Sequence, residues 1–93
     1  MKPYDWDEAK NIKLKAERLV SFEDVLTAID DGRILANIEH PNKIRYGNQK
    51  MYVLKIEDYA YLVPYVEDNE KIFLKTIIPS RRATKKYLKG EEQ

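Results

Sequence analysis

The sequence predicts an α+β fold with two N-terminal helices, a four-stranded, mainly antiparallel sheet and a short basic C-terminal helix. Apolar residues recur at helical spacing before Arg33, and from there the period changes towards two, as in strands. Short polar turns join the later strands, which favours an antiparallel meander. The pattern becomes helical again after Pro79-Ser80. The 93 residues are sufficient for one domain, expected over residues 1–93.

A first helix is expected over roughly residues 6–19, with Asp5 or Asp7 as its N-cap. Apolar side chains at helical spacing predict the stripe that it buries, namely Trp6, Ala9, Ile12, Ala16 and Leu19. Leu14 points away from this stripe. It is either an ordinary exposed leucine or one contact of a partner surface.

A second helix is expected to start at Ser21, a good N-cap followed by acidic residues that suit the helix dipole. It should end at Asp30-Asp31-Gly32, where glycine suits the C′ position. The i, i+3, i+4, i+7 spacing predicts its buried face, which consists of Phe22, Val25, Leu26 and Ile29.

The sheet is predicted from four segments with strand-like composition, separated by polar turns. They are Arg33–Glu39, Gln49–Ile56, Tyr59–Val66 and Lys71–Ile78, with a loop over His40–Asn48. In the third strand, Tyr59, Tyr61, Val63 and Tyr65 should share one face. Pro64 lies in that strand and cannot donate to a ladder, so we expect a bulge or an unpaired edge there.

The C-terminal region is strongly basic. Residues 71–90 carry seven basic residues and no acidic one, whereas residues 1–70 carry ten basic and fourteen acidic residues. Ser80 can cap a helix of about residues 81–89, which has few apolar side chains to bury. Clustered cations of this kind attract phosphates or an acidic protein surface.

Several functional classes are excluded or disfavoured. The chain has no cysteine, so disulfides, thiolate metal sites and cysteine nucleophiles are excluded. A single histidine rules out a His-rich zinc site, and no glycine-rich phosphate loop is present. We therefore expect neither metal nor cofactor. No apolar run is long enough to span a membrane, so a cytoplasmic protein with no membrane partner is expected.

The remaining pattern, basic residues interleaved with tyrosines, suits RNA, because cations bind phosphates and aromatic rings stack on unpaired bases. It also suits metal-free RNA cleavage, which needs an acid or base and cations around the phosphorus. His40 is the natural proton-transfer residue, or else a surface histidine without a role. Lys75 either extends along the surface or serves a site. Tyr61 and Tyr65 are either half-buried sheet residues or stacking platforms.

Adjacent cations at a helix start are disfavoured by the dipole, so Arg81 and Arg82 point to phosphate or to acidic residues of a partner. Lys85, Lys86 and Lys89 suit the C-terminal half of a helix as well as RNA. Arg45 is either a solvated loop arginine or an RNA contact that reaches the sheet face.

Three segments, which together span nearly the whole chain, carry recognisable motifs. Trp6-Asp7-Glu8-Ala9-Lys10 followed by Val20-Ser21-Phe22-Glu23-Asp24 is similar to the WDxxK…VSFEEA pattern of the BrnT family of bacterial toxins. Ile77-Ile78-Pro79-Ser80-Arg81-Arg82-Ala83-Thr84 is similar to its IISARRAT segment. The resemblance implies a RelE-like ribonuclease fold and inhibition of translation by RNA cleavage. It also implies a cognate antitoxin, typically a ribbon-helix-helix DNA-binding protein, through which operator DNA is bound.

Position by position, Arg81 and Arg82 match the family's paired basic residues, and Ser21 to Asp24 match its acidic helix start. Lys50 stands where the family usually has an arginine, which keeps the charge but loses the bidentate fork. Thr76 and Pro79 replace an arginine and a serine, and Glu17-Arg18-Leu19 replaces Lys-His-Gly.

We predict a toxin of a type II toxin-antitoxin system that acts as a metal-independent ribonuclease. Its candidate catalytic residues are His40, Lys50, Tyr65, Lys75, Arg81 and Arg82. Its candidate RNA-binding residues are Arg45, Tyr61, Lys85, Lys86 and Lys89. The alternative is a non-catalytic module whose basic block binds nucleic acid or docks an acidic protein, with Leu14, Tyr59 and Tyr61 in the interface.

Overall fold

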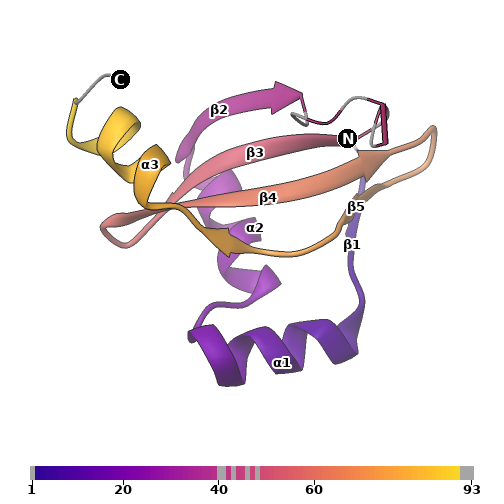
Figure 1. Cartoon of the computed structure of the whole chain (residues 1–93). Helices are drawn as coiled ribbons and strands as arrows, with labels where there is room; N and C mark the ends of the chain where they lie inside the picture. The colour runs from indigo at the N-terminus through magenta and orange to yellow at the C-terminus, as the bar shows by residue number, and fades with distance from the viewer. Residues whose placement is uncertain (1, 40–41, 43, 46, 48, 91–93) are drawn as a thin grey trace.

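The computed structural model describes residues 2–39, 42, 44–45, 47 and 49–90, and over these residues the fold is α+β, as predicted (Figure 1). A mixed open sheet has the strand order β1-β5-β4-β3-β2, and β6 also pairs with β4. Its strands are β1 Tyr4–Asp5, β2 Ile34–Glu39, β3 Gln49–Ile56, β4 Tyr59–Glu67, β5 Ile72–Leu74 and β6 Ile78–Pro79. No helix in the described ranges is long and apolar enough to cross a membrane.

Helix α1 spans Glu8–Arg18, and Asp7 is its N-cap, accepting hydrogen bonds from the backbone N–H groups of Ala9 and Lys10. The buried face differs from the predicted one. Asn11 and Leu14 are buried, whereas Ile12 is 63% exposed and Leu19 is 88% exposed. The predicted stripe was therefore wrong within the helix, although Trp6 before it packs against the main core. The exposed position of Leu14 was wrong too. The cause is Asn11, whose side chain bonds to the next helix and sets the rotation of α1.

Helix α2 spans Phe22–Asp30 and begins as predicted, with Ser21 as N-cap. The Ser21 hydroxyl accepts a hydrogen bond from the Asp24 N–H at 3.2 Å, and the Asp24 carboxylate accepts one from the Ser21 N–H at 2.9 Å. This capping box satisfies two donors at once. Gly32 has a φ of 73°, so glycine relieves the steric cost of the left-handed turn into β2.

The sheet has more strands than the predicted four. Strands β2, β3 and β4 pair antiparallel in sequence order, as expected, but β1 adds a parallel pair to β5. The predicted strand over Lys71–Ile78 is interrupted between β5 and β6. The interruption lies opposite Pro64, which has no N–H for the ladder and only accepts a hydrogen bond from the Lys75 N–H at 2.8 Å. The expected irregularity at Pro64 is confirmed.

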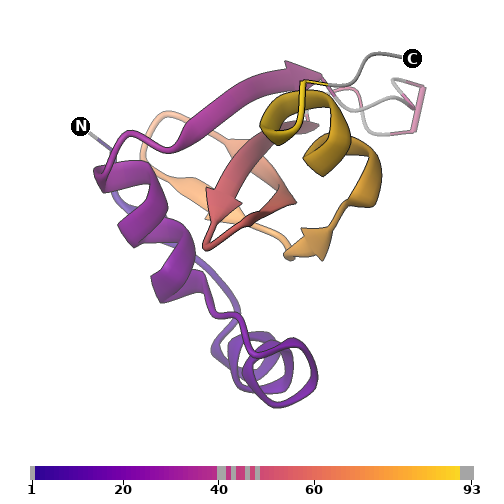
Figure 2. The same ribbon diagram turned by 90° about the vertical axis from the view of Figure 1, so that its left-hand side faces the viewer.

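The two faces of the sheet carry different helices (Figure 2). Helices α1 and α2 cover one face over the main core, which includes Phe22, Leu54, Val63 and Leu74. The C-terminal helix covers part of the other face. It begins as α3, Arg81–Ala83, and continues as a π-helical turn, Thr84–Leu88. A smaller cluster of Val53, Ala60 and Ala83 lies beneath it, with Leu35, Ala36, Leu62, Tyr87 and Leu88 packed around it.

Candidate nucleic-acid interface

The C-terminal helix presents the cations that the sequence singled out. Its basic side chains are all exposed, and they belong to Arg81, Arg82, Lys85, Lys86 and Lys89. Within the described part of the chain, none of them forms a side-chain hydrogen bond or an ion pair. The nearest ring to any of them is Tyr87, whose centroid lies 5.3 Å from Lys86 Nζ. By contrast, Lys2, Arg33 and Lys71 are paired with carboxylates.

Two polar side chains fix the orientation of this helix. The Ser80 hydroxyl accepts a hydrogen bond from the Ala83 N–H at 3.0 Å and caps the helix. Thr84 is buried, and its hydroxyl accepts from the Ala60 N–H at 2.9 Å and donates to the Ser80 carbonyl at 2.8 Å. Because Ala83 and Thr84 face the sheet, the basic residues before and after them lie on the solvent side.

Lys75 lies on the same side of the sheet as this helix. It is exposed, and its Nζ is 5.9 Å from the centroid of the Phe73 ring. Phe73 is paired with Val66 of β4, which shares its face with Ala60 and Leu62 beneath the C-terminal helix. The structure thus places Lys75 on the same side as Arg81 and Arg82.

Lys50 and Tyr65 lie on the opposite face. They are cross-strand partners in β3 and β4, and Tyr65 belongs to the main core under α1 and α2. The Tyr65 side chain is only 2% exposed, and its hydroxyl donates to Asn37 Oδ1 at 3.0 Å. Together the pair lines a cavity of about 290 Å³ with Lys2, Glu67, Asp68 and Asn69. These two candidates are therefore separated by the sheet from the cations of the C-terminal helix.

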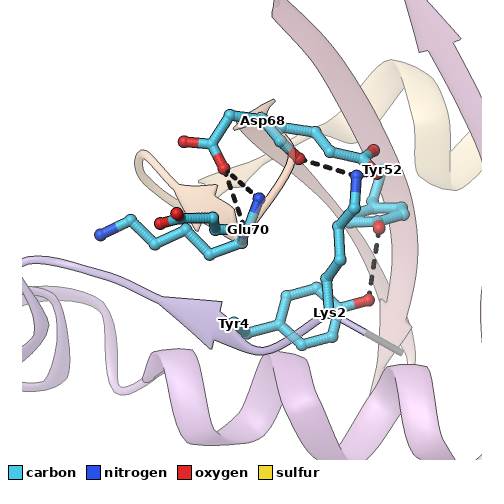
Figure 3. A network of polar contacts seen from close by, with 7 residues as sticks. Lys2, Tyr4, Tyr52, Asp68 and Glu70 are labelled. Atoms are coloured by element: carbon cyan, nitrogen blue, oxygen red, sulfur yellow. Dashed lines mark hydrogen bonds and ion pairs between the residues drawn. The ribbon is translucent and has the colours of Figure 1, made fainter.

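A polar network includes Lys2, Glu67 and Asp68, three of the residues that line this cavity (Figure 3). The hydroxyls of Tyr4 and Tyr52 are 3.3 Å apart, and the Tyr52 ring stacks on Tyr65 with a centroid distance of 4.3 Å. Lys2 Nζ donates to Glu67 Oε2 and to the Asp68 carbonyl, both at 2.7 Å. Burial, and then the hydrogen bond with Tyr4, raises the pKa of Tyr52 well above its ordinary value. Tyr52 is therefore neutral near pH 7, and its contacts with Tyr4 and Tyr65 tie β1, β3 and β4 together.

Tyr61 is half-buried beside Tyr59, with ring centroids 5.8 Å apart, and burial raises its pKa. It packs on the main core, so it too lies on the face opposite the basic helix. Arg45 is exposed in the loop, where its backbone N–H donates to Asn42 Oδ1 at 3.1 Å. His40 lies outside the described residues.

Phe73 lies on the same side of the sheet as Lys75 and the C-terminal helix, and the sequence reasoning did not single it out. The available signal was its position between Lys71 and Lys75, two residues away on either side of it in a strand, where side chains share a face. Among the residues that the structure describes, no cluster of three histidine or acidic side chains is arranged to hold a metal ion.

Comparisons with protein-family models, curated proteins and solved structures give no match to this chain. The likeness to the BrnT family therefore rests on the sequence motifs alone.

Proposed function

We propose that this chain is the toxin of a type II toxin-antitoxin pair, with a RelE-like ribonuclease fold, that inhibits translation by cleaving RNA without a metal ion. The observation that carries the proposal is the set of exposed C-terminal cations that have no partner among the described residues. A group of unpaired cations on one surface raises the local concentration of a polyanion such as RNA. The BrnT-like motifs supply the reaction class.

The cations have a defined part in such a reaction. Arg81 and Arg82 bind phosphate oxygens through planar forks, and Lys75 adds a point charge from the neighbouring edge of the sheet. Cations in this position stabilise the negative charge that builds at phosphorus when the 2′-hydroxyl attacks. His40 is the preferred proton-transfer residue on chemical grounds, because imidazole titrates near neutral pH. The buried hydroxyl of Tyr65, bonded to Asn37, is the weaker choice.

A toxin of this kind needs a neutralising partner. We propose a cognate antitoxin of the ribbon-helix-helix type, which places acidic side chains against the C-terminal cations and binds operator DNA itself. RNA and antitoxin would then compete for Arg81 and Arg82. The toxin and its antitoxin are both cytoplasmic in this proposal.

The test is growth arrest on induction of the chain in bacteria, with the Arg81→Ala/Arg82→Ala variant beside the wild type. Lys10→Ala/Lys13→Ala on α1 is the matched control, since it also removes two exposed charges. We expect arrest by the wild type and the control but not by the folded double variant. Purified wild type that leaves RNA intact, alone and on translating ribosomes, would contradict ribonuclease activity.

A second candidate function is binding without cleavage. It is favoured by the position of Lys50 and Tyr65, which the sheet separates from the C-terminal cations. In this case the basic surface holds RNA or an acidic protein, and no chemistry follows. This function would be selected if the purified protein binds RNA but leaves RNA intact on translating ribosomes.

A further inference from the structure

The Phe73 ring lies close to two lysine ammonium groups on the surface. Lys71 Nζ and Lys75 Nζ are each 5.9 Å from its centroid, within the range of a cation–π contact. The two lysines are not equivalent. Lys71 Nζ is 2.9 Å from Asp5 Oδ2, and this hydrogen bond raises the pKa of Lys71. Lys75 has no carboxylate partner in the described ranges, so its charge is available to a ligand.

We propose that Phe73 is a stacking subsite for one unpaired base of single-stranded RNA, with Lys75 on the adjoining phosphate. The choice of RNA rests on the proposed function. An aromatic ring offers a flat face to any base, and a neighbouring cation fixes the backbone beside it. Half-buried Phe73 is held by its strand pairing with Val66 and Asp5, so the ring is positioned before the ligand arrives.

The surrounding surface indicates the path of the bound RNA. Strand β1 pairs only with Ile72 and Phe73, so the chain beyond Phe73 forms an edge of the sheet in the described structure. From there it follows β4, with Lys75 bonded to Pro64 and Ile78 paired with Leu62, until it reaches Arg81. No acidic residue occurs between Lys71 and Gly90.

Acidic residues lie at the other end of this surface. Asp5 holds Lys71, and Asp68 accepts the backbone N–H groups of Glu70 and Lys71 at 2.8 and 2.9 Å. A phosphate on that side would meet carboxylates. The RNA backbone therefore runs from Phe73 past Lys75 towards Arg81 and Arg82, and this path joins the stacking subsite to the C-terminal cations.

The test uses a fluorescein-labelled 2′-O-methyl oligoadenylate, which cannot be cleaved through its 2′-oxygen, and a matched duplex whose bases are already paired. Binding is measured by fluorescence anisotropy for the wild type, Phe73→Leu, Lys75→Ala and Arg81→Ala/Arg82→Ala. Leucine keeps an apolar side chain at position 73 and removes only the ring. Tyr4→Leu, which removes a half-buried ring from the opposite face of the sheet, is the matched control, and circular dichroism checks that each variant folds.

We expect Phe73→Leu to weaken binding of the single strand by about tenfold and to leave duplex binding unchanged. Lys75→Ala and the double arginine variant should weaken both ligands, because phosphates are common to them. The control should bind as the wild type does. Equal binding of the single strand by Phe73→Leu and wild type overturns the subsite, while the proposed RNA function stands. A wild type that binds neither oligonucleotide overturns both.

Discussion

Asn11 and Phe22 are joined by a buried hydrogen bond in which the Asn11 Oδ1 accepts the Phe22 backbone N–H at 2.7 Å. The same amide donates from Nδ2 to Glu23 Oε1 at 2.9 Å. Asn11 is only 1% exposed, so one polar side chain in α1 satisfies a donor in the first turn of α2, where the helix itself has no acceptor. The contact fixes how the two helices meet.

We expect Asn11→Ala to lower the free energy of unfolding by about 1–3 kcal/mol, because the Phe22 N–H would be left buried without an acceptor. Asn69→Ala, the same change at an exposed turn, is the control and should stay within about 0.5 kcal/mol of the wild type. Urea unfolding of the three proteins measures the difference. Equal midpoints for Asn11→Ala and the wild type would show that the bond is not stabilising.

Stability should also depend on pH through Glu23. The hydrogen bond from Asn11 is the main reason that the pKa of Glu23 lies below its ordinary value. A lowered folded pKa contributes stability above the unfolded pKa, and this contribution is lost as the pH falls through the folded value. Glu23→Gln should therefore lose less stability than the wild type between pH 6 and pH 3, measured by thermal unfolding. The control, Glu17→Gln on α1, should follow the wild type.

The rotation of α1 predicts a contrast between two apolar residues. Leu14→Ala should cost about 2–4 kcal/mol, because the side chain is 4% exposed and its loss leaves a cavity in the main core. Ile12→Ala, at a side chain that is 63% exposed, should change stability by no more than about 0.5 kcal/mol. Denaturant unfolding compares them, and the reverse order would mean that α1 buries its other face.

Tyr65→Phe separates a structural role of the hydroxyl from a catalytic one. Loss of the bond to Asn37 should cost about 0.5–1.5 kcal/mol of stability. The proposed RNA cleavage, measured per folded molecule, should stay unchanged, because this hydroxyl is buried on the face opposite the C-terminal cations. Cleavage assays at a temperature where both proteins are folded make the comparison. Loss of activity in a fully folded variant would restore Tyr65 as a proton-transfer residue.

Elements set by local chemistry could be predicted from the sequence. Ser21 and Gly32 mark the two ends of α2 because a cap hydroxyl and a positive φ are properties of single positions. The bounds of β3, Gln49–Ile56, agree with the prediction, since its residues have strong strand propensity. The exposed cations of the C-terminal helix were also indicated, because the segment carries too few apolar residues to bury two faces.

Elements set by distant contacts could not be predicted. The apolar spacing of α1 indicated a buried stripe, but the hydrogen bond from Phe22 of the next helix to Asn11 decided which face turns inward. The pairing of β1 with β5 joins residues far apart in the sequence, and two residues give no strand signal of their own. Tyr65 and Arg81 lie on opposite sides of the sheet, and this arrangement depends on the pairing register of several strands. Local patterns could therefore not show which candidate residues meet.

The parallel pair between Tyr4 and Ile72 also constrains when the molecule can assemble during its synthesis. Ile72 follows Tyr4 by 68 residues, so β1 has no pairing partner until those residues have been translated. At roughly 5–20 residues per second, this delay is about 3–14 s. During that time Tyr4 and Asp5 lack their strand partners, and a nascent chain that ends before Ile72 cannot form the parallel pair.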